Sequence, residues 1–285
     1  MAEVLTLAGL DDPRIGEGVG VLEHDGLVMI RDLPFALEPG EDGFLTPEVF
    51  SGESKNVSYD PASGKVGGTR VEGETLERMR AMIARYSAFA QGVLARVAPD
   101  YGPHLQLRRT SFRPGAVDTR VMSKRKDDRR LHVDAFPSNP NQGRRILRVF
   151  TNVHPAGLER VWEVGADDFE GYARRWIGQV APQPGGAWRE AVGLTKGRRT
   201  AYDSVMLQLH DKSKLDDAWQ AAEPKTRLGF PPGATWIVYT DSVLHAALSG
   251  QHAFEQTFYL PPEAMAEPAR APVRVLERLM GRPLL

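Results

Sequence analysis

Two side chains that commonly bind metal ions lie two positions apart in the segment RRLHVDAFP: His132 and Asp134. In a β-strand, residues i and i+2 point to the same face, so one imidazole nitrogen and one carboxylate oxygen can reach the same ion. With a second histidine they would complete a 2-His-1-carboxylate facial triad, which leaves open positions and suits non-haem Fe(II). A polar surface role is the alternative, because a histidine and an aspartate at this spacing also occur by chance.

The third ligand has to come from another part of the fold, and the chain has seven histidines. His245 follows PPGATWIVYTDSVLH, in which a proline–glycine turn opens an apolar strand and a short loop then presents the imidazole. We rank it ahead of His210, which precedes a charged stretch, and His154, which lies at a strand end. The predicted metal ligands and catalytic residues are therefore His132, Asp134 and His245.

Composition limits the class of protein that could carry such a site. The chain has 285 residues, 41% of them hydrophobic, which suits one large domain with a sizeable core. Its formal net charge is −1, so no overall field favours nucleic acid. The absence of cysteine excludes disulfides, thiolate metal sites and cysteine nucleophiles. With neither a signal peptide nor an apolar run long enough for a membrane span, we expect a cytoplasmic protein.

The sequence pattern differs between the first hundred residues and the rest of the chain. Residues 75–98 place apolar residues at a 3.6-residue spacing, which predicts a helix capped by Thr75 and ended by Pro99. Residues 40–72 are rich in glycine, serine, proline and aspartate and indicate a loop. Further short helices are expected within 215–224 and in the tail, 271–285.

Segments of β character follow Pro103, separated by proline and glycine: LQLRRTSFRP, ILRVFTNVHP, RVWEVG, ATWIVYTD and AFEQTFYLP. One earlier strand, LVMI, ends in a turn. Such strands predict an α+β, mainly β protein with a double-stranded β-helix (jelly-roll) core. The expected parts are an α-rich, helical and mixed N-terminal extension over 1–103, the core over 104–262, and a C-terminal tail or helix over 263–285. No linker separates them, so they are expected to pack as one unit.

The segments LHVDAF and PGATWIVYTDSVLHAAL together resemble the H-x-D…H pattern of Fe(II)/2-oxoglutarate-dependent oxygenases. The longer run LHVDAFPSNPNQGRRILRVFTNVHP is similar to the Kdo hydroxylases, which act on the 3-deoxy-D-manno-octulosonic acid (Kdo) of lipid A precursors in Gram-negative bacteria. The resemblance covers most of the chain, including LERLMGRPLL. It implies Fe(II) as cofactor, 2-oxoglutarate and O2 as co-substrates, succinate and CO2 as products, and hydroxylation of Kdo at C3 to give the Ko sugar.

Many of these oxygenases hold the distal carboxylate of 2-oxoglutarate with an arginine shortly after the second histidine, but ALSGQHAFEQTFYLP contains no arginine or lysine. A buried dicarboxylate needs a cation. Other branches place it on the strand after H-x-D, and there we expect Arg148, with Asn152 and Gln256 as further co-substrate contacts and Thr257 as an alternative to Gln256. The alternative for Arg148 is an edge-strand arginine in solvent.

Basic residues surround the motif in SKRKDDRR and GRRILR, either as a solvated loop or as a rim for an anionic substrate. The expected substrate contacts are Arg113, Arg144, Arg145 and Trp162. By resemblance the partner is an anionic glycolipid, Kdo-lipid A, reached by peripheral contact with the inner membrane. Rival functions are an oxygenase for another anionic substrate and a non-catalytic, cupin-like sugar-binding protein. The sequence carries no signal of oligomeric state.

Overall fold

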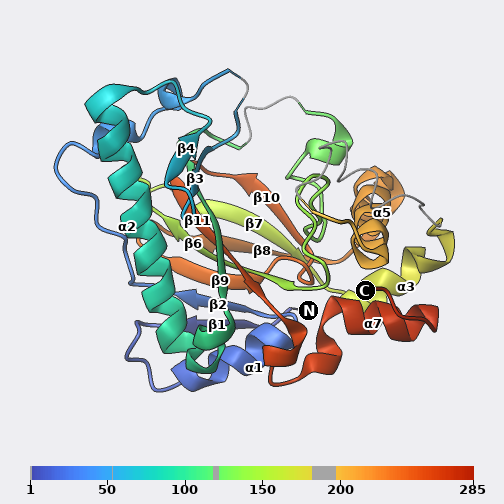
Figure 1. Ribbon diagram of the computed structural model, residues 1–285. Coiled ribbons are helices and arrows are strands. Elements are labelled where there is room, and N and C mark those ends of the chain that lie inside the picture. Colours follow the sequence, from blue (N-terminus) through green and yellow to red (C-terminus); the bar gives the residue numbers. More distant parts are fainter. Residues whose placement is uncertain (1, 53, 118–121, 182–196) are drawn as a thin grey trace.

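The computed structural model describes residues 2–52, 54–117, 122–181 and 197–285. Within these ranges the strands form two sheets, one of eight strands and one of three, and the protein is a mixed α/β structure dominated by the larger sheet (Figure 1). The larger sheet has the order β1 (Val4–Leu7), β2 (Leu27–Ile30), β9 (Thr235–Tyr239), β6 (Arg145–Asn152), β11 (Ala253–Leu260), β5 (Gln106–Arg113), β3 (Val57–Asp60) and β4 (Lys65–Gly67). The smaller has the order β10 (His245–Ser249), β7 (Arg160–Gly165) and β8 (Lys225–Phe230).

The strand β6 lies in the middle of the larger sheet and is buried along its whole length. Side chains alternate between the two faces of a strand, and both faces of β6 are covered. Leu147 and Val149 belong to the main core, which also contains Tyr86 of the long helix. Phe150 points the other way, into an aromatic cluster with Trp162 and Trp236. The space between the two sheets is therefore a second core, distinct from the one under the helix.

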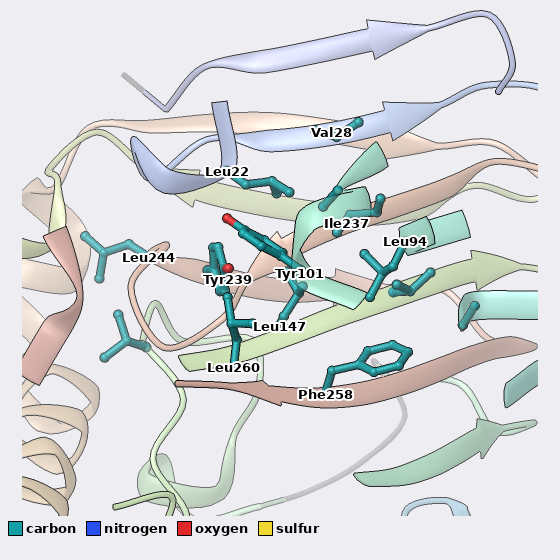
Figure 2. Close-up of a cluster of buried hydrophobic side chains, with 14 of the residues drawn as sticks. Leu22, Val28, Leu94, Tyr101, Leu147, Ile237, Tyr239, Leu244, Phe258 and Leu260 are labelled. Carbon is teal, nitrogen blue, oxygen red and sulfur yellow. The ribbon is translucent and has the colours of Figure 1, made fainter. Parts of the chain in front are cut away.

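The helix α2 (Gly73–Val97) lies across one face of the larger sheet (Figure 1). Its Tyr86 hydroxyl donates a hydrogen bond to the Val149 carbonyl of β6 at 3.0 Å, which fixes the helix on the sheet. Figure 2 shows Leu94 of this helix and Ile237 of β9 as members of one cluster of buried hydrophobic side chains. The predicted helix is confirmed, but it begins two residues before Thr75, which is therefore not its cap.

The first hundred residues contribute more strands to the larger sheet than an α-rich extension was expected to contribute. All four strands β1 to β4 come from this part of the chain and join the eight-stranded sheet. The hairpin of β3 and β4 lies within 40–72, where the sequence indicated only a loop. Strands of three and four residues are too short to show a clear alternation of polar and apolar residues, and these are also rich in polar residues.

The other α-helices within the described residues are all shorter than α2. They are α1 (Gly18–Glu23), α3 (Phe169–Trp176), α5 (Ala201–Leu215), α6 (Asp217–Ala222) and α7 (Pro272–Met280). The sequence predicted α6 and α7 and missed the others, although α5 opens with a reciprocal capping box between Thr200 and Asp203. The tail helix ends at Gly281, which adopts the left-handed conformation with φ 64°. Over the described ranges, no helix combines the length and hydrophobicity that a membrane span requires.

Candidate metal centre

The predicted ligands His132, Asp134 and His245 lie together, each with one ligand atom within 4.8 Å of the others. No other group of three such residues occurs in the described part of the chain. The two imidazole ring centroids are 4.6 Å apart. Both histidines are buried, with 5% and 6% of their surface exposed, so solvent does not compete freely for their ring nitrogens.

Backbone hydrogen bonds hold the two ligand segments side by side. The His132 amide donates to the His245 carbonyl at 3.1 Å, and the His245 amide donates back to the His132 carbonyl at 3.0 Å. The Asp134 amide donates to the Thr240 carbonyl at 2.7 Å. His132 thus sits in an isolated antiparallel bridge with His245, outside any longer strand. The predicted i, i+2 arrangement is still seen, because His132 Nε2 lies 3.8 Å from Asp134 Oδ1.

Each imidazole is oriented by a backbone carbonyl two residues earlier in the chain. His132 Nδ1 lies 2.7 Å from the Arg130 carbonyl, and His245 Nδ1 lies 2.9 Å from the Val243 carbonyl. Carbonyls accept hydrogen bonds, so the proton sits on Nδ1 and the Nε2 lone pair is left for a ligand. Burial lowers the pKa of both histidines, that of His132 to well below its usual range. They are therefore neutral at neutral pH, the form that binds metal.

Asp134 supplies the anionic donor. Burial alone would raise its pKa, but the Arg148 guanidinium and the neighbouring His245 together hold it below its usual range. Arg148 Nη1 lies 3.2 Å from Asp134 Oδ2, which leaves Oδ1 on the side of His132. Two neutral imidazoles and one carboxylate, all on one side of an open space, fit a divalent iron ion well.

A cavity of about 240 Å³ opens beside the three ligands. Arg148 bridges Asp134 and Glu255, with Nη1 at 3.2 Å from Glu255 Oε1. Arg113 holds the other oxygen of Glu255, with Nε at 3.0 Å. The cavity wall carries more cations than anions, which suits an anionic reactant; its charged residues are Lys55, Arg113, Arg148 and Arg160 against Asp128, Asp134 and Glu255.

Three of the other predicted site residues line this cavity: Arg113, Arg148 and Trp162. The Trp162 ring stacks on the His245 imidazole, with centroids 5.2 Å apart and an interplanar angle of 27°. Its indole Nε1 is buried and has no hydrogen-bond partner among the described residues. An indole N–H is a donor only, so it is suited to an acceptor group of a bound molecule.

Asn152 and Gln256, expected to contact the co-substrate, do not line the cavity. Asn152 Nδ2 donates to two backbone carbonyls, those of Leu158 and Phe230, both at 2.9 Å. Gln256 Oε1 accepts from Thr110 Oγ1 at 2.6 Å. Both side chains satisfy buried polar groups of the protein instead of a ligand.

Arg144 and Arg145, expected to contact substrate, also lie outside the cavity lining. Arg145 is 1% exposed; its Nε is 2.9 Å from Asp241 Oδ2, and its guanidinium lies 3.8 Å from the Tyr239 ring centroid. Arg144 precedes the strand β6 and donates to the Asn141 carbonyl at 3.3 Å. Arg145 differs from Arg148 because residues an odd number of positions apart face opposite sides of a strand.

The sequence analysis did not anticipate four charged residues of the cavity wall, which are Lys55, Asp128, Arg160 and Glu255. Arg160 is buried, with 2% exposed, and lies on β7 two positions before Trp162. This spacing on one strand was an available signal, since Trp162 was already expected at the pocket wall. Asp128 lines the cavity with Lys55 Nζ at 3.2 Å from its Oδ2.

The basic run over 123–130 is largely neutralised within the protein. Lys124 and Arg130 both pair with Asp217 at the start of α6, at 2.5 and 2.6 Å. Arg129 pairs with Asp127, at 2.9 Å. These contacts favour the interpretation of the run as a surface loop held against α5 and α6.

The three candidate ligands have the composition of a 2-His-1-carboxylate facial triad, the kind of centre that serves non-haem iron. A family model described as 3-deoxy-D-manno-oct-2-ulosonic acid (Kdo) hydroxylase matches residues 15–283. The chain belongs to this family, as the sequence resemblance predicted.

Solved structures agree with the family match. The Kdo hydroxylase KdoO, described as a non-heme Fe(II) alphaketoglutarate-dependent dioxygenase, is 38% identical in its complex with alphaketoglutarate and Fe(III), with a TM-score of 0.93. Its cobalt(II) complex is 39% identical, with a TM-score of 0.94. Both alignments cover 99% of this chain and 97% of the other. A comparison with curated protein sequences finds no match.

Proposed function

We propose that this chain is an Fe(II)- and 2-oxoglutarate-dependent dioxygenase that hydroxylates a Kdo sugar. The observation that carries the proposal is the candidate donor set of His132, Asp134 and His245 on the wall of a cavity that also has arginine side chains in its lining. When bound, the iron would couple the oxidation of 2-oxoglutarate by O2, to succinate and CO2, with insertion of the other oxygen atom into a C–H bond of the sugar. The two sheets would be the halves of a double-stranded β-helix, with the cavity between them.

The residues around the metal position would each have a defined role in that reaction. His132 and His245 would hold the metal through Nε2, with their rings fixed by the carbonyls of Arg130 and Val243. Asp134 would bind through Oδ1 while Arg148 keeps its Oδ2 in place. Trp162 covers the His245 imidazole and would restrict water at the metal.

The distal carboxylate of 2-oxoglutarate needs a cation some distance from the metal, because the other end of the molecule chelates it. We assign this role to Arg160. Val164 of β7 pairs with His245, and Arg160 lies four positions earlier on the same strand. Arg148, the residue predicted from the sequence, touches the metal ligand Asp134 itself and also Glu255, so it is placed to orient the ligand. It is the alternative anchor.

Substitution separates the two arginines. Arg160→Gln is expected to weaken apparent binding of the co-substrate 2-oxoglutarate, measured as its KM, by at least about tenfold, because a charge-assisted hydrogen bond is lost, and to leave metal affinity nearly unchanged. Arg148→Gln should instead weaken metal binding. Steady-state succinate formation and anaerobic metal titration measure the two effects. If Arg148→Gln raised the co-substrate KM and Arg160→Gln did not, the anchor would be Arg148.

Trp162→Phe tests the indole N–H as a donor to a bound reactant. The phenyl ring keeps an aromatic contact with His245, so the expected change is a rise of about tenfold in the KM for either the sugar or the co-substrate, from the lost hydrogen bond. Trp236→Phe is the matched control, because that Nε1 is likewise buried without a described partner but lies outside the cavity lining. Equal effects of the two substitutions on KM would assign Trp162 a packing role only.

The substrate assignment carries the finer part of the proposal: Kdo-lipid A, hydroxylated at C3, met at the inner membrane surface from the cytoplasm. It is supported by the family match. The test is to incubate the purified protein with Fe(II), O2, 2-oxoglutarate and a Kdo-bearing glycolipid. We expect succinate and a sugar heavier by one oxygen atom, with the new hydroxyl located by fragmentation. Succinate without a modified sugar would move the enzyme to another substrate, and sugar binding without succinate would favour the non-catalytic rival.

A further inference from the structure

A second cavity, of about 740 Å³, lies against the β3–β4 hairpin. It shares two wall residues with the metal cavity, Lys55 and Asn56, so the two spaces adjoin. Nothing in the metal-site chemistry uses this second space. Its position, at the β4 edge of the larger sheet, can be followed in Figure 1.

One face of the sheet connects the two cavities. Across four neighbouring strands, Glu255 pairs with Ser111, Ser111 with Ser58, and Ser58 with Gly67. Paired residues share a face, and neighbouring strands are about 4.8 Å apart, so this row runs about 14 Å from Glu255 to Gly67. Glu255 lines the metal cavity, whereas Ser58 and Gly67 line the second. A molecule that lies along this face can reach both.

Two arginines of the strand β5 also link the two cavities. Arg113 lines the metal cavity and Arg109, four positions earlier, lines the second. The pairing of β5 with β11 shifts register next to Arg109, so a contact and not regular alternation places this residue beside the hairpin. Arg109 Nη1 donates to Ser58 Oγ at 3.2 Å, which directs its guanidinium along the hairpin.

The second cavity is mainly basic. Its charged lining residues are Lys55, Lys65 and Arg109 against a single acid, Asp60. Lys55 is engaged at the boundary, with Nζ 2.9 Å from the Lys126 carbonyl and 3.2 Å from Asp128. Lys65 and Arg109 are both exposed, and they line only the second cavity, where an incoming anion could reach them. Serine hydroxyls from the hairpin also line the space and can donate to phosphate or carboxylate oxygens.

We propose that the second cavity binds a further anionic group of the substrate, a phosphate or a second sugar carboxylate, through Lys65 and Arg109 while the reacting sugar lies at the metal. The inference rests on the proposed hydroxylase function. It assigns the recognition of a multiply charged substrate to a surface outside the metal cavity. With such a subsite, the enzyme would prefer an acceptor that carries a second anion at the right distance over a single sugar acid.

The test compares the purified protein with the double variant Lys65→Ala/Arg109→Ala on three acceptors. These are a Kdo glycoside with one anionic group, a Kdo disaccharide, and Kdo on a phosphorylated glucosamine disaccharide. The double variant is expected to raise the KM about threefold to tenfold for one or both of the larger acceptors, with kcat and the KM for the simple glycoside unchanged. A raised KM for the disaccharide alone identifies the carboxylate as the group bound in the second cavity. A raised KM for the phosphorylated acceptor alone identifies the phosphate.

Two matched controls accompany it. Arg31→Ala/Arg282→Ala removes two exposed positive charges elsewhere and should leave every KM unchanged. Gly67 lines the cavity, and a Cβ added there would meet nothing within 4 Å. Gly67→Glu should therefore raise the KM for the larger acceptors by repelling their second anion, and the neutral Gly67→Gln should do so less.

The outcomes separate the subsite from the proposed function. A wild-type protein that hydroxylates the sugar but whose KM does not respond to Lys65→Ala/Arg109→Ala overturns the subsite and leaves the function standing. So does a double variant indistinguishable from Arg31→Ala/Arg282→Ala, or a Gly67→Glu variant equal to Gly67→Gln. A wild-type protein that forms no succinate with any of the three acceptors overturns both proposals.

Discussion

Replacing Asp134 with asparagine is expected to reduce metal affinity by more than about 100-fold and to stop sugar-dependent succinate formation. Loss of an outer partner of a metal ligand typically costs 10- to 100-fold in affinity, so loss of a direct ligand should cost more. The asparagine also removes the negative charge that faces Arg148, leaving a guanidinium next to the metal position. Anaerobic titration with Fe(II) or cobalt(II) measures the affinity without depending on turnover.

His210→Ala is the matched control for that experiment. The His210 ring lies edge-on to His132, with centroids 5.5 Å apart, but His210 is outside the set of three ligands. It was also the second-ranked candidate in the sequence. We expect its affinity for metal to stay within about tenfold of the parent protein. If His210→Ala abolished binding and Asp134→Asn did not, the ligand assignment would be wrong.

Replacing Arg145 with methionine is expected to lower the free energy of unfolding by about 3–5 kcal/mol, because it leaves the Asp241 carboxylate buried without its partner. The pair is 1% and 0% exposed in its side chains. Burial raises the pKa of Asp241, although Arg145 opposes the shift. Without Arg145 the carboxyl would be protonated more easily, so the loss of stability should shrink as pH falls and grow as pH rises. Chemical denaturation at several pH values measures it.

Arg144→Met is the control for the neighbouring position. Arg144 is partly exposed and bonded only within its own loop in the described contacts, so its loss should change stability by no more than about 0.5–1 kcal/mol. Neither substitution should change the KM for the sugar or for the co-substrate. A raised KM in Arg145→Met at a temperature where the variant is folded would restore the substrate role predicted from the sequence.

The candidate metal ligands could be predicted because their sequence signals are local. His132 and Asp134 need only their i, i+2 spacing, and His245 is marked by a turn and an apolar strand before it. The long helix and most strands of the second half were also found, because their periodicity spans enough residues. The structure places the three ligands together as expected.

The rest of the site depends on strand pairing, which the sequence does not display. Arg160 reaches the cavity because β7 pairs with β10, so that Trp162 lies opposite Ala247 and Val164 opposite His245. Arg145 turns away from the cavity because of where β6 begins and which of its faces meets the other sheet. A shift of one residue in register exchanges the two faces of a strand, so arginines close together in one run can lie on opposite faces of the sheet.

The reciprocal hydrogen bonds between His132 and His245 also set the order in which the protein can mature. The two residues are more than a hundred positions apart, so their pairing closes a long loop and belongs to the slow, non-local part of folding. A nascent chain that has not yet delivered β10 offers only His132 and Asp134, and these without the bridge that aligns them. We therefore expect the complete set of candidate ligands, and with it iron binding, to form only after β10 has joined the sheets.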